Sequence, residues 1–407
     1  MSMLLLLNIS LTFYSLWDMS SSAISLTKIT LFFLNFIVGF GVFIVFIIDI
    51  FYGYKMPITE LPQVEILYLT SVLFFMITVF LFNRIVNSKK KLKNHNFRLV
   101  SDIRFPLFSL ALLSIICVLL YVLVAGISFG KSSYELRYTN ARGVGFLLVF
   151  FPAFIPYFIF ELERCMKDRL DFKRFFLVSV VGLSYSGLLF VVLGGYRQIL
   201  MGVSMLIGFY LLKYKVIAFK SMFIAIFTIF PALLVFLSFL RYGGETTVFY
   251  SPLEASLYYI QGDLFPVDAI LKTIFFLETY ASPGSEVFFD HFLRLVPRYF
   301  YPDKPLILNN TAGFYTQEII QYSRGVTLSP TLVTEGLLIN GLVGVILISV
   351  FTALFCCSYD FILIRTNDAI LYCCLVSFVF MGFFIIREGL ESGVYRFIVM
   401  LVFYYIL

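Results

Sequence analysis

Residues 29–50 read "ITLFFLNFIVGFGVFIVFIIDI", an apolar run whose one charged side chain, Asp49, stands near its end. A helix needs about 20 mainly apolar residues to cross the hydrocarbon core of a bilayer. The run meets that length, and a charge is tolerated best near the end of a span. We therefore expect it to form a membrane-spanning helix.

Similar runs recur along the whole chain. Of its 407 residues 61% are apolar and 13% charged, and the mean hydropathy is +0.97. Soluble domains are about half apolar and a quarter charged, so the composition indicates an integral membrane protein. We expect an all-α polytopic protein of about eleven transmembrane helices: eight in residues 1–240, a large loop at 241–332 and three in 333–407. The other ten runs lie at about 3–17, 64–83, 105–126, 144–162, 175–193, 199–213, 217–240, 333–357, 369–386 and 394–407.

Lys and Arg residues predict the orientation. The segment 84–104, "RIVNSKKKLKNHNFRLVSDIR", is strongly basic and should be cytoplasmic, because cytoplasmic loops carry an excess of Lys and Arg. Alternation from there places the basic segments 164–174 and 213–220 on the same side. The N-terminus is then periplasmic, the C-terminus cytoplasmic, and residues 241–332 form a periplasmic loop whose short amphipathic helices rest on the membrane.

One segment of this loop, "LRLVPRYFYPDKP" at 293–305, is too rich in proline and charge to span a membrane. We interpret it as the floor of a substrate cavity. There Tyr299 would stack on sugar, and Arg298 and Lys304 would point at the acceptor or at a diphosphate. A plain interfacial anchor is the alternative interpretation.

Several cations stand at the predicted outer ends of helices. Arg197 lies in "VLGGYRQIL", Arg241 in "FLSFLRYGGE" and Arg387 in "FFIIREGLESGVYRF". Snorkelling to the interface explains a single such residue. It explains the set less well, because Arg outnumbers Lys on this side and binds phosphate in a bidentate way. We therefore predict that Arg197, Arg241 and Arg387 converge on one diphosphate. The remaining candidate substrate-binding cations are Arg294, Arg298, Lys304, Arg324 and Arg396.

Two carboxylates, Glu335 and Glu388, are candidate catalytic groups beside these cations. For Glu335 the alternative is a charge that the dipole of its own helix N-terminus favours. For Glu388 the alternative is an ion pair with Arg387. His291 is a further possible base, but a lone loop histidine is more often not one.

Motifs of other enzyme classes are missing from the sequence. It contains no P-loop, GxGxxG, HExxH, GxSxG or CxxC motif, and only two histidines, so we expect no metal and no cofactor. The modest net charge of +6 gives no reason to expect nucleic acid as a partner. An enzyme on the outer face has no ATP, so its energy must come with the substrate. A lipid diphosphate donor fits that constraint.

Five short motifs, in this order and spacing, resemble the O-antigen polymerase (Wzy) family, and its enterobacterial common antigen branch in particular. They cover roughly residues 175–400 and read "GGYR" (194–197), "LRYGG" (240–244), "VPRYFYPDKP" (296–305), "LSPTLVTEG" (328–336) and "REGLES" (387–392).

The resemblance implies a metal-independent glycosyltransferase of GT-C-like architecture in the bacterial inner membrane. It would transfer a growing glycan from undecaprenyl diphosphate to a new lipid-linked repeat unit at the periplasmic face, with a chain-length regulator as partner. By matching position Arg197, Arg241, Arg387 and Lys304 carry over as the basic residues, and Glu388 carries over with its arginine. Arg298, Glu335 and His291 have no counterpart in that branch.

Two other functions stay open. An O-antigen ligase would share the architecture and use a loop histidine, for which His291 is available. A lipid-linked oligosaccharide flippase or transporter is the other, although transporters usually have short loops and internal repeats.

Overall fold

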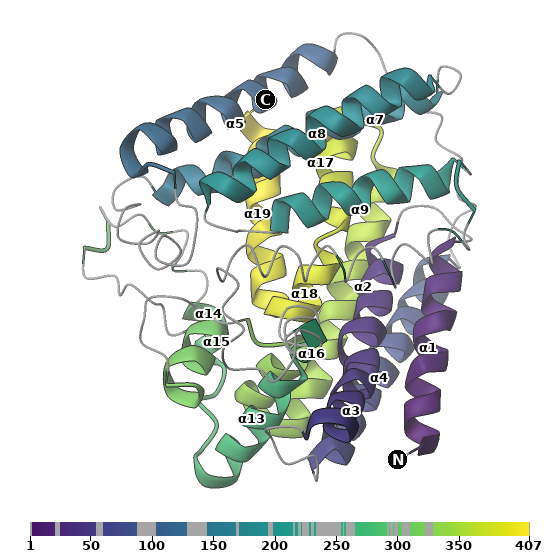
Figure 1. Cartoon of the computed structure of the whole chain (residues 1–407), viewed down its shortest axis with the longest axis vertical. Coiled ribbons are helices and arrows are strands. Elements are labelled where there is room, and N and C mark those ends of the chain that lie inside the picture. Colours follow the sequence, from purple (N-terminus) through teal and green to yellow (C-terminus); the bar gives the residue numbers. More distant parts are fainter. Residues whose placement is uncertain are drawn as a thin grey trace. The chain divides into compact units, whose positions relative to one another are not determined.

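The computed structural model describes eleven main ranges of the chain and a few single residues between them. The ranges are 2–20, 25–53, 60–87, 103–127, 145–167, 171–193, 198–214, 216–218, 265–290, 310–321 and 329–406. Their regular elements are helices (Figure 1), and the chain divides into two compact units.

The first unit combines Met1–Lys93, Thr246–Phe361 and Met381–Tyr395. Its core is built by the N-terminal helices together with α16 and α18, and the loop helices α13 to η7 belong to the same unit. The elements are α1 (Ser2–Ser20), α2 (Leu26–Leu34), η1 (Asn35–Gly39), α3 (Phe40–Tyr52), α4 (Leu61–Asn87), α13 (Val267–Thr279), α14 (Glu286–Phe289), α15 (Thr311–Phe314), η7 (Tyr315–Ile319), α16 (Leu332–Arg365) as far as Phe361, α18 (Gly382–Glu388) and the start of α19 (Leu390–Ile406).

The second unit combines Asn94–Glu245, Ile362–Phe380 and Arg396–Leu407. Helix α7 packs against α5, α8 and α17 in this unit. The elements are α5 (Arg104–Ala125), η4 (Gly145–Phe154), α7 (Ile155–Lys167), α8 (Phe172–Val192), α9 (Gln198–Lys213), α17 (Ala369–Val379) and the rest of α19.

The described helices make this a multi-pass membrane protein by length and hydropathy. Six are long and apolar enough to cross a bilayer: Leu26–Phe51, Leu61–Val86, Arg104–Ala125, Phe146–Met166, Phe172–Val192 and Leu332–Arg365. A seventh results if α17 and α18, separated by a short break, count as one broken span.

The all-helical membrane fold is therefore confirmed, while the number of spans in the described residues is lower than the eleven predicted. The run at 199–213 forms the short helix α9, and the run at 394–407 falls in the 17-residue helix α19. The run at 3–17 forms the 19-residue helix α1, which is not among the candidate spans. The run at 217–240 lies almost entirely outside the described residues.

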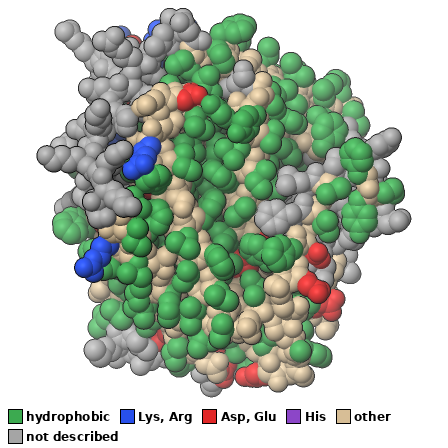
Figure 2. Space-filling view, turned by 180° about the vertical axis from the view of Figure 1, so that it is seen from behind, with side chains coloured by type: hydrophobic (Ala, Val, Ile, Leu, Met, Phe, Trp, Pro, Cys, Tyr) green, Lys and Arg blue, Asp and Glu red, His purple; other side chains and the backbone are tan. Residues whose placement is uncertain are grey.

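Exposed apolar side chains form a stripe along α4. Ile66, Leu73, Ile77 and Phe80 are each more than two-fifths exposed, and they recur at intervals of three, four or seven residues. That spacing places them on one face of a helix, where they would contact lipid. Figure 2 shows hydrophobic side chains over much of the visible face and few charged ones.

The first long span contains a short π-helical segment, η1, which begins at a buried polar residue. The side chain of Asn35 accepts the hydroxyl of Tyr68 at 2.6 Å, and its main-chain oxygen accepts the hydroxyl of Thr12 at 3.1 Å. A Cβ atom on Gly39 would lie 2.7 Å from the Tyr68 hydroxyl, so glycine makes room for the tyrosine. Hydrogen bonds thus tie η1 to both α1 and α4.

Helix α16 is broken near its start. Asn340 (φ −165°, ψ 51°) and Gly341 (φ 55°, ψ −138°) are not helical, so residues 332–339 form a short arm separate from the span at 342–365. A Cβ on Gly344 would collide with the main-chain oxygen of Gly336, so the arm packs closely against the span. The predicted single span at 333–357 is therefore wrong in its first turns.

The break frees the carbonyl oxygen of Leu338, which would otherwise accept the N–H of residue 342. Instead it accepts the hydroxyl of Ser282 and the N–H of Gly284, the latter at 3.3 Å. The connection between α13 and α14 is thereby fastened to the arm.

Candidate functional site

A buried carboxylate joins the arm of α16 to the start of α19. Glu335 is fully buried, and its two oxygens accept the N–H groups of Leu390 at 2.6 Å and Glu391 at 3.1 Å. The first N–H groups of a helix have no partner within the helix and carry its positive dipole end, so they stabilise a carboxylate. Glu335 therefore caps α19.

Gly389 permits this cap. The chain turns between α18 and α19 at this residue, with φ 102°, a value that L side chains rarely adopt. A Cβ on Gly389 would lie 2.7 Å from Oε2 of Glu335. The motif "REGLES" and the motif "LSPTLVTEG" thus meet at Gly389 and Glu335.

Arg387 and Glu388 occupy the last turn of α18, immediately before this glycine, and both are half-buried. The hydroxyl of Ser392 donates to Glu388 at 2.9 Å across the turn. Since Glu335 fixes the main chain at residues 389–391, it also limits where Arg387 and Glu388 can point. The capped turn is a rigid support for one cation and one carboxylate.

A third carboxylate completes this polar cluster. Glu391 is fully buried and accepts the side-chain amide of Asn310 at 3.4 Å. The oxygen of the Asn310 side chain in turn caps α15 by accepting the N–H of Gly313 at 3.0 Å. One described segment of the predicted loop is therefore linked to the turn that carries Arg387.

The structure brings three predicted site residues together in the first unit: Glu335, Arg387 and Glu388. Arg396 lies further along α19, in the second unit, and is half-buried. The other predicted residues fall outside the described residues, so the convergence of the arginines stays a prediction. These are Arg197, Arg241, Arg294, Arg298, Tyr299, Lys304 and Arg324, together with His291.

Sequence reasoning missed Glu391 and Asn310 and also a second cluster, around α7. In the second unit Oε1 of Glu163 accepts the ammonium of Lys213 at 2.6 Å and the hydroxyls of Tyr210 at 3.1 Å and Tyr372 at 3.2 Å. Its Oε2 accepts the hydroxyl of Tyr214 at 2.7 Å. The signal in the sequence was the pair of glutamates in "FELERC" at the end of an apolar run.

Burial and the nearby charge of Glu163 raise the pKa of Tyr214 above its usual value. The neighbouring Glu161 forms ion pairs with Arg104 at 3.1 Å and Arg174 at 2.7 Å, whose side chains are more exposed than Lys213. The two glutamates thus anchor α7 to different neighbours. The four donors named above bind a carboxylate whose side chain is only 3% exposed, which favours a role of Glu163 in holding α7, α9 and α17 together.

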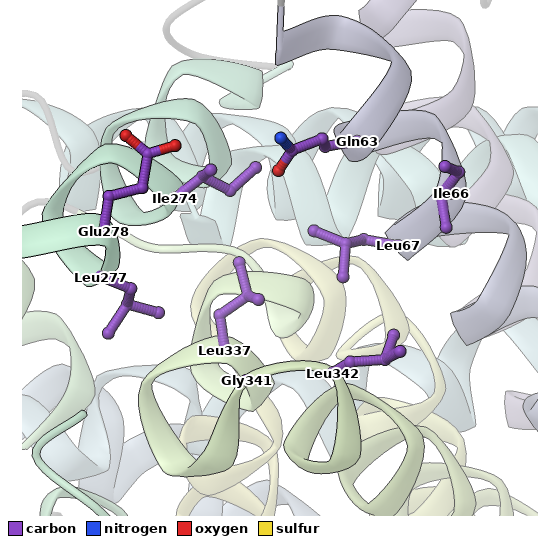
Figure 3. A pocket seen from close by; sticks show the side chains of 9 residues that line it. All are labelled: Gln63, Ile66, Leu67, Ile274, Leu277, Glu278, Leu337, Gly341 and Leu342. Atoms are coloured by element: carbon purple, nitrogen blue, oxygen red, sulfur yellow. The ribbon is translucent and has the colours of Figure 1, made fainter. Parts of the chain in front are cut away.

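A pocket of about 370 Å³ lies between α4, α13 and α16 in the first unit (Figure 3). Six apolar side chains form most of its wall, namely Ile66, Leu67, Ile274, Leu277, Leu337 and Leu342. The broken helix contributes Gly341. The carboxylate of Glu278 and the carboxamide of Gln63 lie at one edge of it (Figure 3).

In the described ranges, no group of three or more His, Cys, Asp or Glu side chains is arranged to hold a metal ion. Comparison with known proteins gave no match to any family model. It also gave no match to any solved structure.

Proposed function

We propose that the protein polymerises undecaprenyl-diphosphate-linked oligosaccharide repeat units. It transfers the growing glycan to a new lipid-linked unit at the periplasmic face of the inner membrane, with a chain-length regulator as partner. The observation that best supports this proposal is the contact of Glu335 with Leu390 and Glu391. It joins two of the motifs that suggested the function, although they stand more than fifty residues apart.

The proposed chemistry needs cations where the diphosphate leaves. A hydroxyl of the acceptor sugar attacks the anomeric carbon of the growing glycan, the bond from that carbon to the phosphate oxygen breaks, and the diphosphate lipid leaves with the electron pair. Arg387, Arg197 and Arg241 would stabilise the charge that develops on it, each fixed donor contributing about 3–4 kcal/mol. The proton of the hydroxyl would pass to a carboxylate, for which half-buried Glu388 is available.

The proposed orientation is supported by the direction of two spans in the first unit. Gln63 and Leu67 of α4 line the same pocket as Gly341 and Leu342 of α16. Closer to the C-terminal end of each helix, the hydroxyls of Ser71 and Ser349 share a hydrogen bond of 2.7 Å. Both helices therefore run in the same direction. Their last turns carry Arg84 and Arg365, as expected for cytoplasmic ends.

The direct test is reconstitution of the purified protein with a chemically defined repeat unit on undecaprenyl diphosphate and no added metal. We expect a ladder of products that differ by one repeat unit. Arg387→Ala should lose polymer by a factor of about 10²–10³ while the protein stays in the membrane at its normal level. Arg387→Lys should recover only part of it, because the bidentate fork is lost.

The lipopolysaccharide of a deletion strain separates the alternatives. A core that carries a single repeat unit indicates a lost polymerase. A bare core indicates a lost ligase or flippase and would overturn the proposal.

A further inference from the structure

We propose that the pocket between α4, α13 and α16 binds one acyl chain of an aminophospholipid from the bilayer, with the lipid ammonium group at Glu278. This site is separate from the proposed transfer reaction and does not depend on it.

The pocket adjoins the hydrocarbon of the membrane. Two of its walls come from candidate spans, α4 and α16. Ile66 and Leu342, which line it, are 57% and 50% exposed, and the exposed faces of these spans are where lipid chains lie. A chain can therefore enter from the side without crossing the polar interface.

The interior suits an apolar chain. Leu67, Ile274 and Leu337 in the wall are each less than a tenth exposed, so the inner surface is fixed by packing. The volume of about 370 Å³ falls within the range of about 300–1,000 Å³ that is typical of small-molecule sites. Gly341 lines the pocket without a side chain, and nothing lies within 4 Å of the position that a Cβ would take there.

The charge at the edge selects the head group. Glu278 is exposed and stands in the last turn of α13, where the negative end of the helix dipole adds to its own charge. Gln63, which also lines the pocket, can donate or accept a hydrogen bond. None of the described residues that line the pocket is Lys or Arg. An ammonium head group is attracted to this edge, whereas a lipid whose head group is only phosphate or diphosphate meets a carboxylate.

The test uses the full-length protein in phosphatidylglycerol vesicles that contain a small fraction of a lipid with a photoreactive group in one acyl chain. The probe is either phosphatidylethanolamine or phosphatidylglycerol with the same chains. We expect peptides from 61–67, 270–279 and 336–343 to be labelled about threefold more by the ethanolamine probe, the ratio that an exposed charge pair provides.

Two pairs of variants make the result specific. Glu278→Gln should bring the two probes to equal labelling, whereas Glu286→Gln, an exposed glutamate on α14, should leave the preference unchanged. Leu342→Trp should fill the pocket and abolish its labelling by both probes. Leu73→Trp, at a similarly exposed position of α4 outside the pocket, should not. All four positions are exposed, so the variants should fold.

Four outcomes would overturn the proposal. Equal labelling by both probes in the unaltered protein would show that the lipid ammonium group does not pair with Glu278. Labelling of the three segments no stronger than that around Leu73 would remove the site. Displacement of the probe by undecaprenyl diphosphate, but not by phosphatidylethanolamine, would assign the pocket to the donor lipid. If the pocket is labelled in the monomeric fraction of the protein but not in a dimeric fraction, a second copy of the chain fills the pocket.

Discussion

Oε2 of Glu335 accepts the main-chain N–H of Leu390 at 2.6 Å, and this one hydrogen bond joins the arm of α16 to the first turn of α19. Both residues are buried, and the second oxygen of the carboxylate accepts the next N–H along the helix. These bonds fix the main chain directly after Arg387 and Glu388, which end α18.

We expect Glu335→Gln to destabilise the protein by about 1–3 kcal/mol, because the amide can accept only one of the two N–H groups and leaves the other buried without an acceptor. The melting temperature in detergent measures this. Glu286→Gln, on the exposed surface, is the control and should leave it unchanged. A melting temperature of Glu335→Gln equal to that of the control would contradict the capping role.

Gly389→Ala should destabilise the protein more than Gly53→Ala. Both glycines have positive φ, 102° and 70°, so both alanines suffer backbone strain of about 1–3 kcal/mol. At Gly53 nothing lies within 4 Å of the added Cβ, whereas at Gly389 it would meet the Glu335 carboxylate at 2.7 Å. Melting temperatures of the two variants isolate that collision. Equal losses would mean that the carboxylate moves aside without cost.

Glu163→Gln should destabilise the second unit by about 1–3 kcal/mol, because a carboxamide has only one acceptor oxygen for the Lys213 ammonium and the hydroxyls of Tyr210, Tyr214 and Tyr372, and Tyr210 is buried. Glu161→Gln should cost less, about 1 kcal/mol or below, because its partners Arg104 and Arg174 are 52% and 36% exposed and can be hydrated. Thermal unfolding of the two variants in the same detergent compares them. The reverse order would mean that Glu163 is not the main anchor of α7.

Stability should fall as the pH rises above about 10, the usual pKa of tyrosine. Because burial raises the pKa of Tyr214, the folded protein holds this proton more tightly than the unfolded chain. Its contribution is fully present below the unfolded pKa and is lost as the pH rises through the higher folded pKa. In Tyr214→Phe the melting temperature should fall less steeply between pH 10 and 11. Tyr280→Phe, at an exposed tyrosine, should follow the unaltered protein.

Single cysteines should report the proposed orientation. Ser285→Cys lies on the exposed start of α14 and should react with a membrane-impermeant thiol reagent added to intact cells from the periplasmic side. Ser88→Cys, in the basic segment that follows α4, should react only after the membrane is opened. The six natural cysteines are buried, so background labelling should be low. The opposite labelling pattern would invert the topology.

The sequence predicted the long spans well, because a mainly apolar run such as 29–50 has few ways to bury its main chain in lipid except as a helix. It did not show which helices touch, since hydropathy does not fix how each helix is rotated. The hydrogen bond from the N–H of Leu390 to Glu335 depends on how α16 is rotated about its axis. The sequence could therefore predict only that Glu335 is a carboxylate near the start of a helix.

The break in α16 was foreseeable in part. Asn340 and Gly341 form an Asn-Gly pair, which is a turn signal, but within "GLLINGLVGVIL" the apolar neighbours hid it. Glu163 was missed for a related reason. Its partners Tyr210, Tyr214 and Tyr372 come from two distant segments, and a tyrosine in an apolar run reads as an ordinary interfacial residue.

The break at Asn340 and Gly341 bears on how the chain is inserted during synthesis. Thirty-four helical residues would measure about 51 Å, well beyond the hydrocarbon thickness of about 30 Å, whereas the part after Gly341 alone is long enough to span. The arm and the span therefore leave synthesis as consecutive segments but do not form one straight helix. Ser282 and Gly284, which hold the carbonyl of Leu338, precede it in the chain and are synthesised before it. When the arm is made, its binding partner on the connection between α13 and α14 has therefore already been made from the same chain.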